Sequence, residues 1–430
     1  MKNRNTRFTT ILLALACFGL LPKAQAVSPA PDGGYANANT AEGTNALFSL
    51  TSGLENTANG FESLYHNTTG QYNTAIGGAV LFHNTTGGGN TATGAFALNQ
   101  NNGHDNTATG LEALFKNTTG IYNTAIGSQA LYFNTTGQYN TANGYRALFS
   151  NTTGSYNTAT GLSALYHNTI GVNNTANGEG ALITNTTGHD NTASGYQALA
   201  FNTTGYANTA AGYEALFSNT TGYNNTANGD GALLANTTGS GNTALGANAG
   251  SGITTAHDVI CVGAVGANVS NSCYIGNIFN ATSSGGTAVL VNSNGRLGTT
   301  TSSRRFKEEI KPMERASEAL YALKPVTFRY KKGIDPQGIP QFGLVAEDVE
   351  AVNPDLVVRD GEGKVNTVRY DQVNAMLLNE FLKEHRKVEK LEAALDAVNK
   401  RLNEQEAKIQ KVGAQVGVSK PATKVVLNSQ

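Results

Sequence analysis

The chain of 430 residues is long enough for two or three domains, and its formal net charge of −1 gives no reason to expect a nucleic acid or an anionic membrane as partner. Fifty glycines and the absence of tryptophan argue against an ordinary globular enzyme core. Only seven of the 29 lysines and arginines precede residue 301, so the first two-thirds of the chain is neutral and polar and the last third is charged.

The first 26 residues have the pattern of a secretory signal peptide, so we assign residues 1–26 to it. Lys2, Arg4 and Arg7 form a basic region, residues 11–21 form an apolar region, and a small-x-small cleavage site, Ala-Gln-Ala, ends at residue 26. Residues 27–38 would then be a short linker.

Lipidation at Cys17 is the alternative to simple cleavage. It is disfavoured because Ala14 stands where a lipobox has a large aliphatic residue, and because apolar residues continue after the cysteine. No later segment approaches the ~20 apolar residues that a membrane-spanning helix needs. We therefore expect an exported mature chain without a membrane span, either secreted or at the cell surface, with the periplasm as a further alternative.

A repeat of 17 residues occupies residues 39–250. Its motif, Asn-Thr-Ala-x-Gly, recurs every 17 residues except for one step of 16 between Asn90 and Asn106. A fixed short period is typical of a solenoid, in which each unit is one coil stacked on its neighbours. The units begin at Asn39, Asn56, Asn73, Asn90, Asn106, Asn123, Asn140, Asn157, Asn174, Asn191, Asn208, Asn225 and Asn242.

The residues of the unit predict how a coil is built. Thr-Ala-x-Gly is expected to be a short strand with its alanine inside, and the recurrent leucine, such as Leu114 or Leu148, is the larger core residue. Asn-Thr-Thr-Gly supplies turn residues, and stacked Asn and Thr side chains can bond from coil to coil. The segment around the leucine, such as 111–115, is either a second strand or one helical turn, since so few residues do not decide between them.

Functional interpretations of the repeats are weaker than this structural one. Most Asn-Thr-Thr units match a glycosylation sequon, but their fixed position favours ladder and turn roles. His66 and His83 occupy equivalent positions in adjacent units without a recurring carboxylate, so we expect no metal and no cofactor. The scattered acids Glu112, Glu179 and Glu214 lack the pairing that a glycoside hydrolase needs.

The units resemble the head repeats of trimeric autotransporter adhesins, which are parallel β-rolls associated in threes. The resemblance covers about half of the chain and implies a mainly β fold, a parallel β-roll or β-helix-like solenoid that forms a homotrimer. It also implies a partner class for the repeats, a surface glycan or another cell-surface ligand. The chain departs from that family at its C-terminus, where nothing resembles the membrane strands that anchor those adhesins.

Residues 251–301 are predicted to form a β-rich neck in which the repeat degenerates. Residues 288–291 alternate and lead into a hairpin-type turn at 292–295. After export, Cys261 and Cys273 would be in an oxidising setting, so a disulfide between them and two buried free thiols are both open alternatives.

The segment 301–310 marks the change from the polar array to the charged C-terminal third. It contains Ser302, Ser303 and, five residues after the first serine, Lys307. A neutral lysine can activate a serine nucleophile without histidine, and the two arginines between them would help to lower its pKa. The spacing separates Ser302 and Lys307 in a helix or strand, so they meet only if the chain bends or if the lysine comes from another chain. From these residues alone, a basic surface loop is the simpler interpretation.

The sequence that begins at Ser302 resembles the self-cleaving intramolecular chaperone domain of phage endosialidase tailspikes, other fibres and myelin regulatory factor. That family has the pattern Ser-Asp-x-Arg-x-Lys, which residues 302–307 follow except that Ser303 replaces the aspartate. Later segments match in the same order as far as residue 412, namely 323–330, 341–349 and 368–370.

This resemblance implies an autocatalytic serine peptidase that cuts only its own chain, at the Thr301–Ser302 bond. Ser302 would be the nucleophile and Lys307 the general base. Ser303 is the alternative nucleophile, because it stands where the family has aspartate. Residues 302–375 would form the auto-processing chaperone domain, and its partner would be other copies of the same chain.

A long amphipathic helix is expected from residue 371 onward, with a coiled coil over residues 376–412 of about five heptads. Glu384 and Gln405 interrupt its apolar seam, and the tail, 413–430, is predicted to be disordered. The seam residues are Leu377, Phe381, Val388, Leu391, Leu395, Val398, Leu402, Ile409 and Val412. Within the chaperone region we expect a helix at 314–323, strands at 326–330 and 341–345, and a turn at 360–363.

These patterns favour a secreted homotrimeric fibre whose C-terminal domain directs trimer assembly and then cuts itself off. Near-identical coils specify their mutual register weakly, so a separate trimerising domain would set it. Cleavage afterwards would leave a fibre that unfolds slowly. The alternative is an uncut adhesin or glycan-binding fibre in which the C-terminal domain only holds the trimer together.

Overall fold

The structure is a computed structural model that describes residues 36–279, 281, 283–292 and 295–418. The predicted signal peptide, residues 1–26, lies outside the described residues, as does most of the predicted tail. The chain divides into two compact units between residues 282 and 283, a repeat array and a C-terminal unit. No helix in the described ranges is long and apolar enough to cross a membrane.

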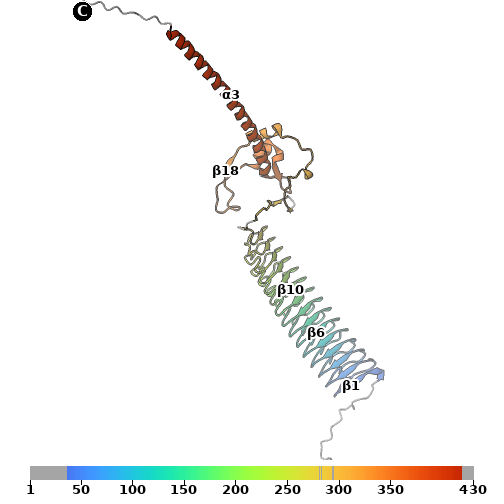
Figure 1. Cartoon of the computed structure of the whole chain (residues 1–430). Coiled ribbons are helices and arrows are strands. Elements are labelled where there is room, and N and C mark those ends of the chain that lie inside the picture. The colour runs from blue at the N-terminus through green and yellow to red at the C-terminus, as the bar shows by residue number, and fades with distance from the viewer. Residues whose placement is uncertain (1–35, 280, 282, 293–294, 419–430) are drawn as a thin grey trace, which may run out of the picture. The chain divides into compact units, whose positions relative to one another are not determined.

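The first unit is a parallel β-solenoid, as the repeat predicts (Figure 1). After a short turn, η1 (Ala36–Ala38), fifteen strands of three residues each in the described part of this unit form one parallel sheet in which every strand pairs with its neighbours in sequence. The strands are β1 Thr40–Glu42, β2 Thr57–Asn59, β3 Thr74–Ile76, β4 Thr91–Thr93, β5 Thr107–Thr109, β6 Thr124–Ile126, β7 Thr141–Asn143, β8 Thr158–Thr160, β9 Thr175–Asn177, β10 Thr192–Ser194, β11 Thr209–Ala211, β12 Thr226–Asn228, β13 Thr243–Leu245, β14 Ile260–Val262 and β15 Cys273–Ile275.

Alanine and leucine fill the interior of each coil. The central alanine of a strand, such as Ala142 in β7, is fully buried, while the residues on either side of it face outward. The predicted core leucines Leu114 and Leu148 are also fully buried. These side chains join into one continuous core that runs from Ala41 to Cys261.

The segment around the leucine is neither a strand nor a helical turn. Gln129 and Leu131 have φ angles of 60° and 52°, in the left-handed region. Their N–H groups donate to the carbonyls of Leu111 and Ala147 in the adjacent coils, not to residues of their own segment. The chain can therefore turn tightly because neighbouring coils satisfy its backbone groups.

Two columns of buried asparagines connect each coil to the next. In the first column, Nδ2 of Asn140 donates to Oδ1 of Asn123 in the preceding coil (3.1 Å) and to the carbonyl of Gly154 (2.9 Å), which closes its own coil. In the second column, Nδ2 of Asn134 donates to Oδ1 of Asn117 (2.7 Å). All four asparagines are fully buried. The predicted bonding of stacked asparagines from coil to coil is confirmed.

The asparagines of the Asn-Thr-Thr turns form the second column. Asn67, Asn134 and Asn151 are fully buried, so a glycosylating enzyme cannot reach them in the folded array. The rings of His66 and His83 stack with centroids 5.5 Å apart. The described residues contain no group of three or more potential metal ligands.

One glycine column brings the coils too close together for a side chain. Gly144 has a φ angle of 145°, and a Cβ atom placed there would lie 2.4 Å from the carbonyl oxygen of Gly161 in the next coil. Any other residue would therefore be strained and would also push the two coils apart.

In the one short unit, residues 90–105, an asparagine side chain replaces a missing backbone group. In regular coils a threonine carbonyl, such as that of Thr135, accepts from three consecutive N–H groups of the preceding coil. In the short coil, Oδ1 of Asn102 accepts these bonds from Thr85 (3.1 Å), Thr86 (3.0 Å) and Gly87 (3.3 Å). An amide oxygen is the same kind of acceptor as a peptide carbonyl, so the stacking continues across the deletion.

The sheet continues through β14 and β15 into the region that the sequence assigns to the neck. Val259 stands where the next asparagine of the first column would be, and its N–H donates to Oδ1 of Asn242 (2.9 Å). Cys261 pairs with Tyr274, so Cys273 is offset from it by one residue and points to the other face. Both cysteines are free, Cys261 buried in the core and Cys273 exposed. Neither the disulfide nor a pair of buried thiols is therefore present.

The described residues of the second unit form three small antiparallel sheets: β16 (Leu290–Val291) with β17 (Leu297–Gly298), β18 (Val326–Phe328) with β19 (Gln341–Gly343), and β20 (Val357–Arg359) with β21 (Val365–Val368). Its helices are η2 (Arg304–Phe306), η3 (Glu314–Ala322), α2 (Ala346–Val352), η4 (Pro354–Leu356) and α3 (Tyr370–Val418). The helix expected at 314–323 is a 3₁₀ helix, and the two strands expected at 326–330 and 341–345 are present but shorter.

The long predicted helix is α3, which continues past Gly413 to Val418. In a single chain its predicted seam faces solvent. The exposed seam residues are Leu377, Phe381, Val388, Leu391, Leu395, Val398, Leu402, Ile409 and Val412.

Replacing Asn140 with alanine should destabilise the array by roughly 2–5 kcal/mol, because buried groups then lose their partners. The backbone and side-chain N–H groups of Asn157 would lose their acceptor, and the Gly154 carbonyl would keep only one of its two donors, Nδ2 of Asn151. The matched control is Asn143→Ala in the same coil, which faces solvent and should change stability by at most about 0.5 kcal/mol. Urea denaturation followed by circular dichroism measures both, and equal effects would contradict the role of the column.

Candidate self-cleavage site

The predicted cleavage segment is an exposed turn in the second unit. It is shaped by η2, in which the N–H of Phe306 donates to the Ser303 carbonyl (3.0 Å) and the N–H of Lys307 donates to the Arg304 carbonyl (3.1 Å). Every residue from 301 to 310 is exposed. The segment is therefore accessible to solvent and to other chains.

In a single chain the predicted nucleophile and base are not hydrogen-bonded to each other. Within the described residues, the side chains of Ser302, Ser303 and Lys307 make no hydrogen bond or ion pair. The turn does bend the chain between Ser302 and Lys307, which is one of the two routes by which their spacing allows them to meet. The other route, a lysine from another copy, requires assembly. Their catalytic roles stay predictions.

A polar cluster centred on two buried residues, Ser317 and Glu380, joins η3 to the start of α3, and sequence analysis did not predict it. Oγ of Ser317 donates to Oε1 of Glu380 (2.5 Å) and accepts from Nδ2 of Asn379 (2.6 Å). The hydroxyl of Tyr321 donates to Oε2 of Glu380 (2.7 Å), and Nζ of Lys383 donates to Oε1 (2.6 Å). Ser317 is fully buried and Glu380 is only 8% exposed. The cluster therefore fixes η3 against α3.

This cluster also contains a serine and a lysine, with Nζ of Lys383 at 3.4 Å from Oγ of Ser317. Lys383 is the cation of an ion pair with Glu380, and a protonated lysine cannot accept the serine proton. Full burial also keeps Ser317 away from any exposed peptide bond. We conclude that this pair is structural and does not compete with Ser302 as nucleophile.

The cluster shifts the pKa values of two of its members in opposite directions. Hydrogen bonds from Lys383, Ser317 and Tyr321 lower the pKa of Glu380 to about 2. The hydrogen bond from Tyr321 to the Glu380 carboxylate raises the pKa of Tyr321 to about 12. Both shifts favour the protonation states in which the hydrogen bonds form, so the cluster persists over a wide pH range.

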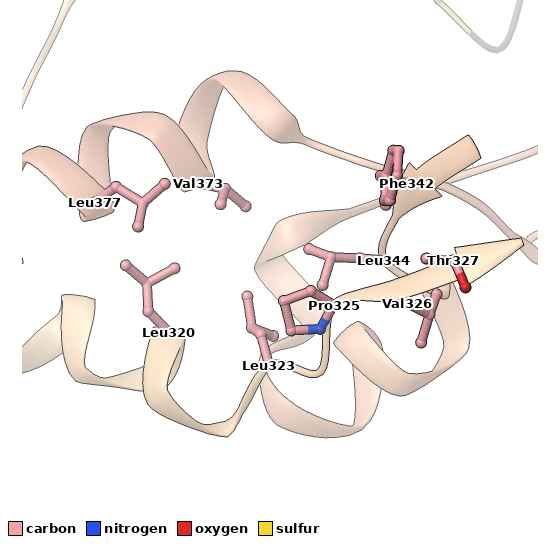
Figure 2. Close-up of a pocket in the computed structure, with 10 residues that line it drawn as sticks. Leu320, Leu323, Pro325, Val326, Thr327, Phe342, Leu344, Val373 and Leu377 are labelled. Atoms are coloured by element: carbon pink, nitrogen blue, oxygen red, sulfur yellow. The ribbon is translucent and has the colours of Figure 1, made fainter. Parts of the chain in front are cut away.

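An apolar groove of about 470 Å³ opens in the same unit (Figure 2). Figure 2 shows Val373 and Leu377 of α3 opposite Leu320 of η3 and Leu323, the residue that directly follows η3. Phe342, from β19, lines the groove and is 84% exposed. The remaining lining residues are Pro325, Val326, Thr327, Gly343 and Leu344.

The buried core of the second unit is small. Among the described residues it consists of six side chains, with further apolar residues packed against them only partly buried. Little apolar surface is therefore buried within this unit in a single chain. The core residues are Val349, Leu356, Val357, Val368, Val373 and Met376.

Comparison with known proteins finds a family match within this unit. The model of the family described as chaperone of endosialidase matches residues 302–358. Residues 302–358 belong to the endosialidase chaperone family. The match begins at Ser302, the residue that is predicted to follow the cut, and it confirms the resemblance stated from the sequence. The repeat array lies outside this match, so its resemblance to adhesin heads stays a prediction.

A phage protein is also similar to the chain. The long tail fiber protein Gp37 of Escherichia phage AR1 is 36% identical to it over 64 residues. This stretch makes up 14% of the chain and 6% of the phage protein, so the chain spans a small fraction of that relative's length. No solved structure matches the chain.

The stability of the second unit should fall as the pH is lowered from about 4.5 toward 2. The pKa of Glu380 drops from 4.5 to about 2 on folding, so within this window the unfolded chain binds the proton more tightly and becomes favoured. Glu380→Gln, which does not titrate, should be less stable at neutral pH and should show a flatter pH profile.

The measurement is thermal unfolding of the full chain followed by the helical signal in far-UV circular dichroism. Glu392→Gln is the matched control, because Glu392 lies on an exposed part of α3 and should keep the wild-type profile. Equal slopes in wild type and Glu380→Gln would contradict the assigned role of Glu380.

Proposed function

We propose that the second unit is an intramolecular chaperone that assembles three copies of the chain into a fibre and then cuts each chain at the Thr301–Ser302 bond. The observation that carries the proposal is the family match over residues 302–358, which begins at the predicted cut. The fibre would be the repeat array, and its place would be extracellular, attached to a cell surface or to a phage particle.

Two exposed apolar surfaces of the second unit support a role in assembly. The α3 seam exposes apolar side chains at heptad spacing, such as Leu391 (69%) and Leu395 (59%). Burying such a seam against the same seam of other copies is the usual basis of a coiled coil. The groove lined by Leu320 and Leu377 offers a second surface that a neighbouring copy can cover.

The repeat array explains why a separate assembly unit is useful. From β2 to β12 the first residue of every strand is an outward-facing threonine, and each pairs with the threonine of the next coil. Two arrays that slip by one coil would therefore meet nearly the same surface again. A unit that brings the chains together first would set the alignment before the arrays pair.

The proposed reaction is one hydrolysis per chain. Oγ of Ser302 attacks the carbonyl carbon of Thr301 while neutral Lys307 accepts the hydroxyl proton. The peptide nitrogen leaves with a proton, which gives an ester between Thr301 and the Ser302 oxygen. Water then hydrolyses the ester and leaves a carboxylate on Thr301. Because Ser302 and Lys307 are not hydrogen-bonded to each other in a single chain, assembly would complete the site and so precede the cut.

A second candidate function is an uncut adhesin or glycan-binding fibre in which the second unit only holds the trimer. It is favoured by Ser303, which replaces the aspartate of the family pattern next to the nucleophile. In both functions, a surface glycan or another cell-surface ligand is the proposed partner of the array.

Freshly expressed wild-type protein should contain a fragment that begins at Ser302, detected by denaturing gel and intact mass. Ser302→Ala and Lys307→Ala should slow its formation by about 10²-fold or more, because they remove the nucleophile and the base. Lys311→Ala is the matched control, since Lys311 is an exposed lysine directly after the segment 301–310, and it should cleave normally.

The variant Ser303→Ala shows which of the two serines, Ser302 or Ser303, is the nucleophile. Cleavage that survives Ser303→Ala assigns the nucleophile to Ser302, whereas loss of cleavage only in Ser303→Ala moves the nucleophile by one residue. Wild type that stays whole as a stable trimer contradicts self-processing and supports the uncut fibre.

A further inference from the structure

The outward face of the solenoid sheet changes character over its last three strands. From β2 to β12 the first outward position is threonine in every strand, and the second is mostly Asn, Thr or Ser. In β13, β14 and β15 the same two positions carry Thr243 and Leu245, Ile260 and Val262, and Cys273 and Ile275.

These side chains form a continuous exposed surface, the end patch, which consists of Leu245, Ile260, Val262, Cys273 and Ile275. The four aliphatic members are between 38% and 52% exposed. Direct pairing aligns Ile260 with Cys273, and Leu245 with Val262 and Ile275, in two straight columns. A contiguous apolar face of this kind on a sheet is typical of a protein–protein interface.

We propose that the end patch is the surface through which the arrays of the three copies contact one another in register. This inference rests on the proposed trimer and names the part of the array that holds it. The occupant is a second copy of the chain, and it presents the same patch.

Two observations favour another copy over an unrelated partner. The outward positions from β2 to β15 carry no charged residue, so identical faces can approach without electrostatic repulsion. The end patch also precedes α3 in the same chain. Copies that are joined through the exposed α3 seam would hold their end patches at high effective concentration.

The end patch would also fix the register between two copies of the array. The outward-facing threonines at the first position of strands β2 to β12 do not specify this register. A slip of one coil between two copies would place Ile260 of one against Thr243 of the other and would expose part of the apolar surface to water. The threonines of the preceding strands would still face threonines after such a slip, because each coil carries the same residue at this position. The patch lies before the proposed cut, so it would keep the arrays aligned after the second unit has left.

Cys273 provides a direct test, because it belongs to the end patch and its thiol is free and exposed. Mild oxidation with copper–phenanthroline in air removes two electrons and two protons from a pair of thiols and forms one disulfide. The oxidised protein should give a covalent dimer of the chain that carries Cys273, whether or not that chain has been cut at Ser302, on a non-reducing denaturing gel. The dimer should be lost in Cys273→Ser and kept in Cys261→Ser, since Cys261 is buried in the core.

A charge in the patch should interfere with this contact. Ile260→Asp should slow cross-linking by about tenfold or more, because a carboxylate would have to be buried against apolar side chains. Leu162→Asp is the matched control, since Leu162 is 50% exposed, close to the 46% of Ile260, but lies outside the patch. Cross-linking in the control should match wild type.

Sedimentation of the same samples separates the two proposals. A trimer that does not cross-link through Cys273, or that cross-links equally well with Ile260→Asp, overturns the end patch and leaves the proposed trimer standing. A protein that sediments as a monomer and does not cross-link overturns both. A trimer whose cross-link requires Cys273 and is weakened only by Ile260→Asp supports both.

Discussion

The buried asparagine columns are the interaction on which the whole array depends. Each side chain uses its oxygen and both amide hydrogens, as Asn140 does with Asn123, Gly154 and Asn157, so no coil is satisfied without the coils on both sides. Leaving a buried amide group unpaired costs more free energy than one hydrogen bond contributes. A closed coil is therefore stable only when another coil stacks on it. The column ends only where a backbone group replaces the next side chain, at Val259.

The repetition that stabilises the stacking of coils inside the array leaves the register between the outer surfaces of two arrays undetermined. Within one chain, the covalent backbone fixes the order in which the identical coils stack. Between chains there is no such constraint, and a threonine column looks the same after a slip of one coil. A chaperone unit after the array, and a region where the outward residues change, such as β13–β15, are two ways to supply the missing alignment.

In the second unit, one contact between helices is fixed within a single chain, while several apolar surfaces have no partner in a single chain. The Ser317–Glu380 cluster fixes η3 against α3, while the core is small and the α3 seam and the groove are open to solvent. The predicted nucleophile and base are also not hydrogen-bonded to each other in the described residues. If assembly completes all of these at once, cleavage follows assembly without a separate signal, because the same contacts that form the trimer would form the site.

The sequence by itself determined the parallel solenoid, its buried alanine and leucine core and the family of the region that begins at Ser302, because a fixed period and a local motif are written in neighbouring residues. Only the tertiary structure decided the left-handed conformation at Leu131, the replacement of a carbonyl by Asn102 and the opposite faces of Cys261 and Cys273. These features depend on contacts with the next coil. The Ser317–Glu380 bond joins residues 63 positions apart and leaves no local pattern at all.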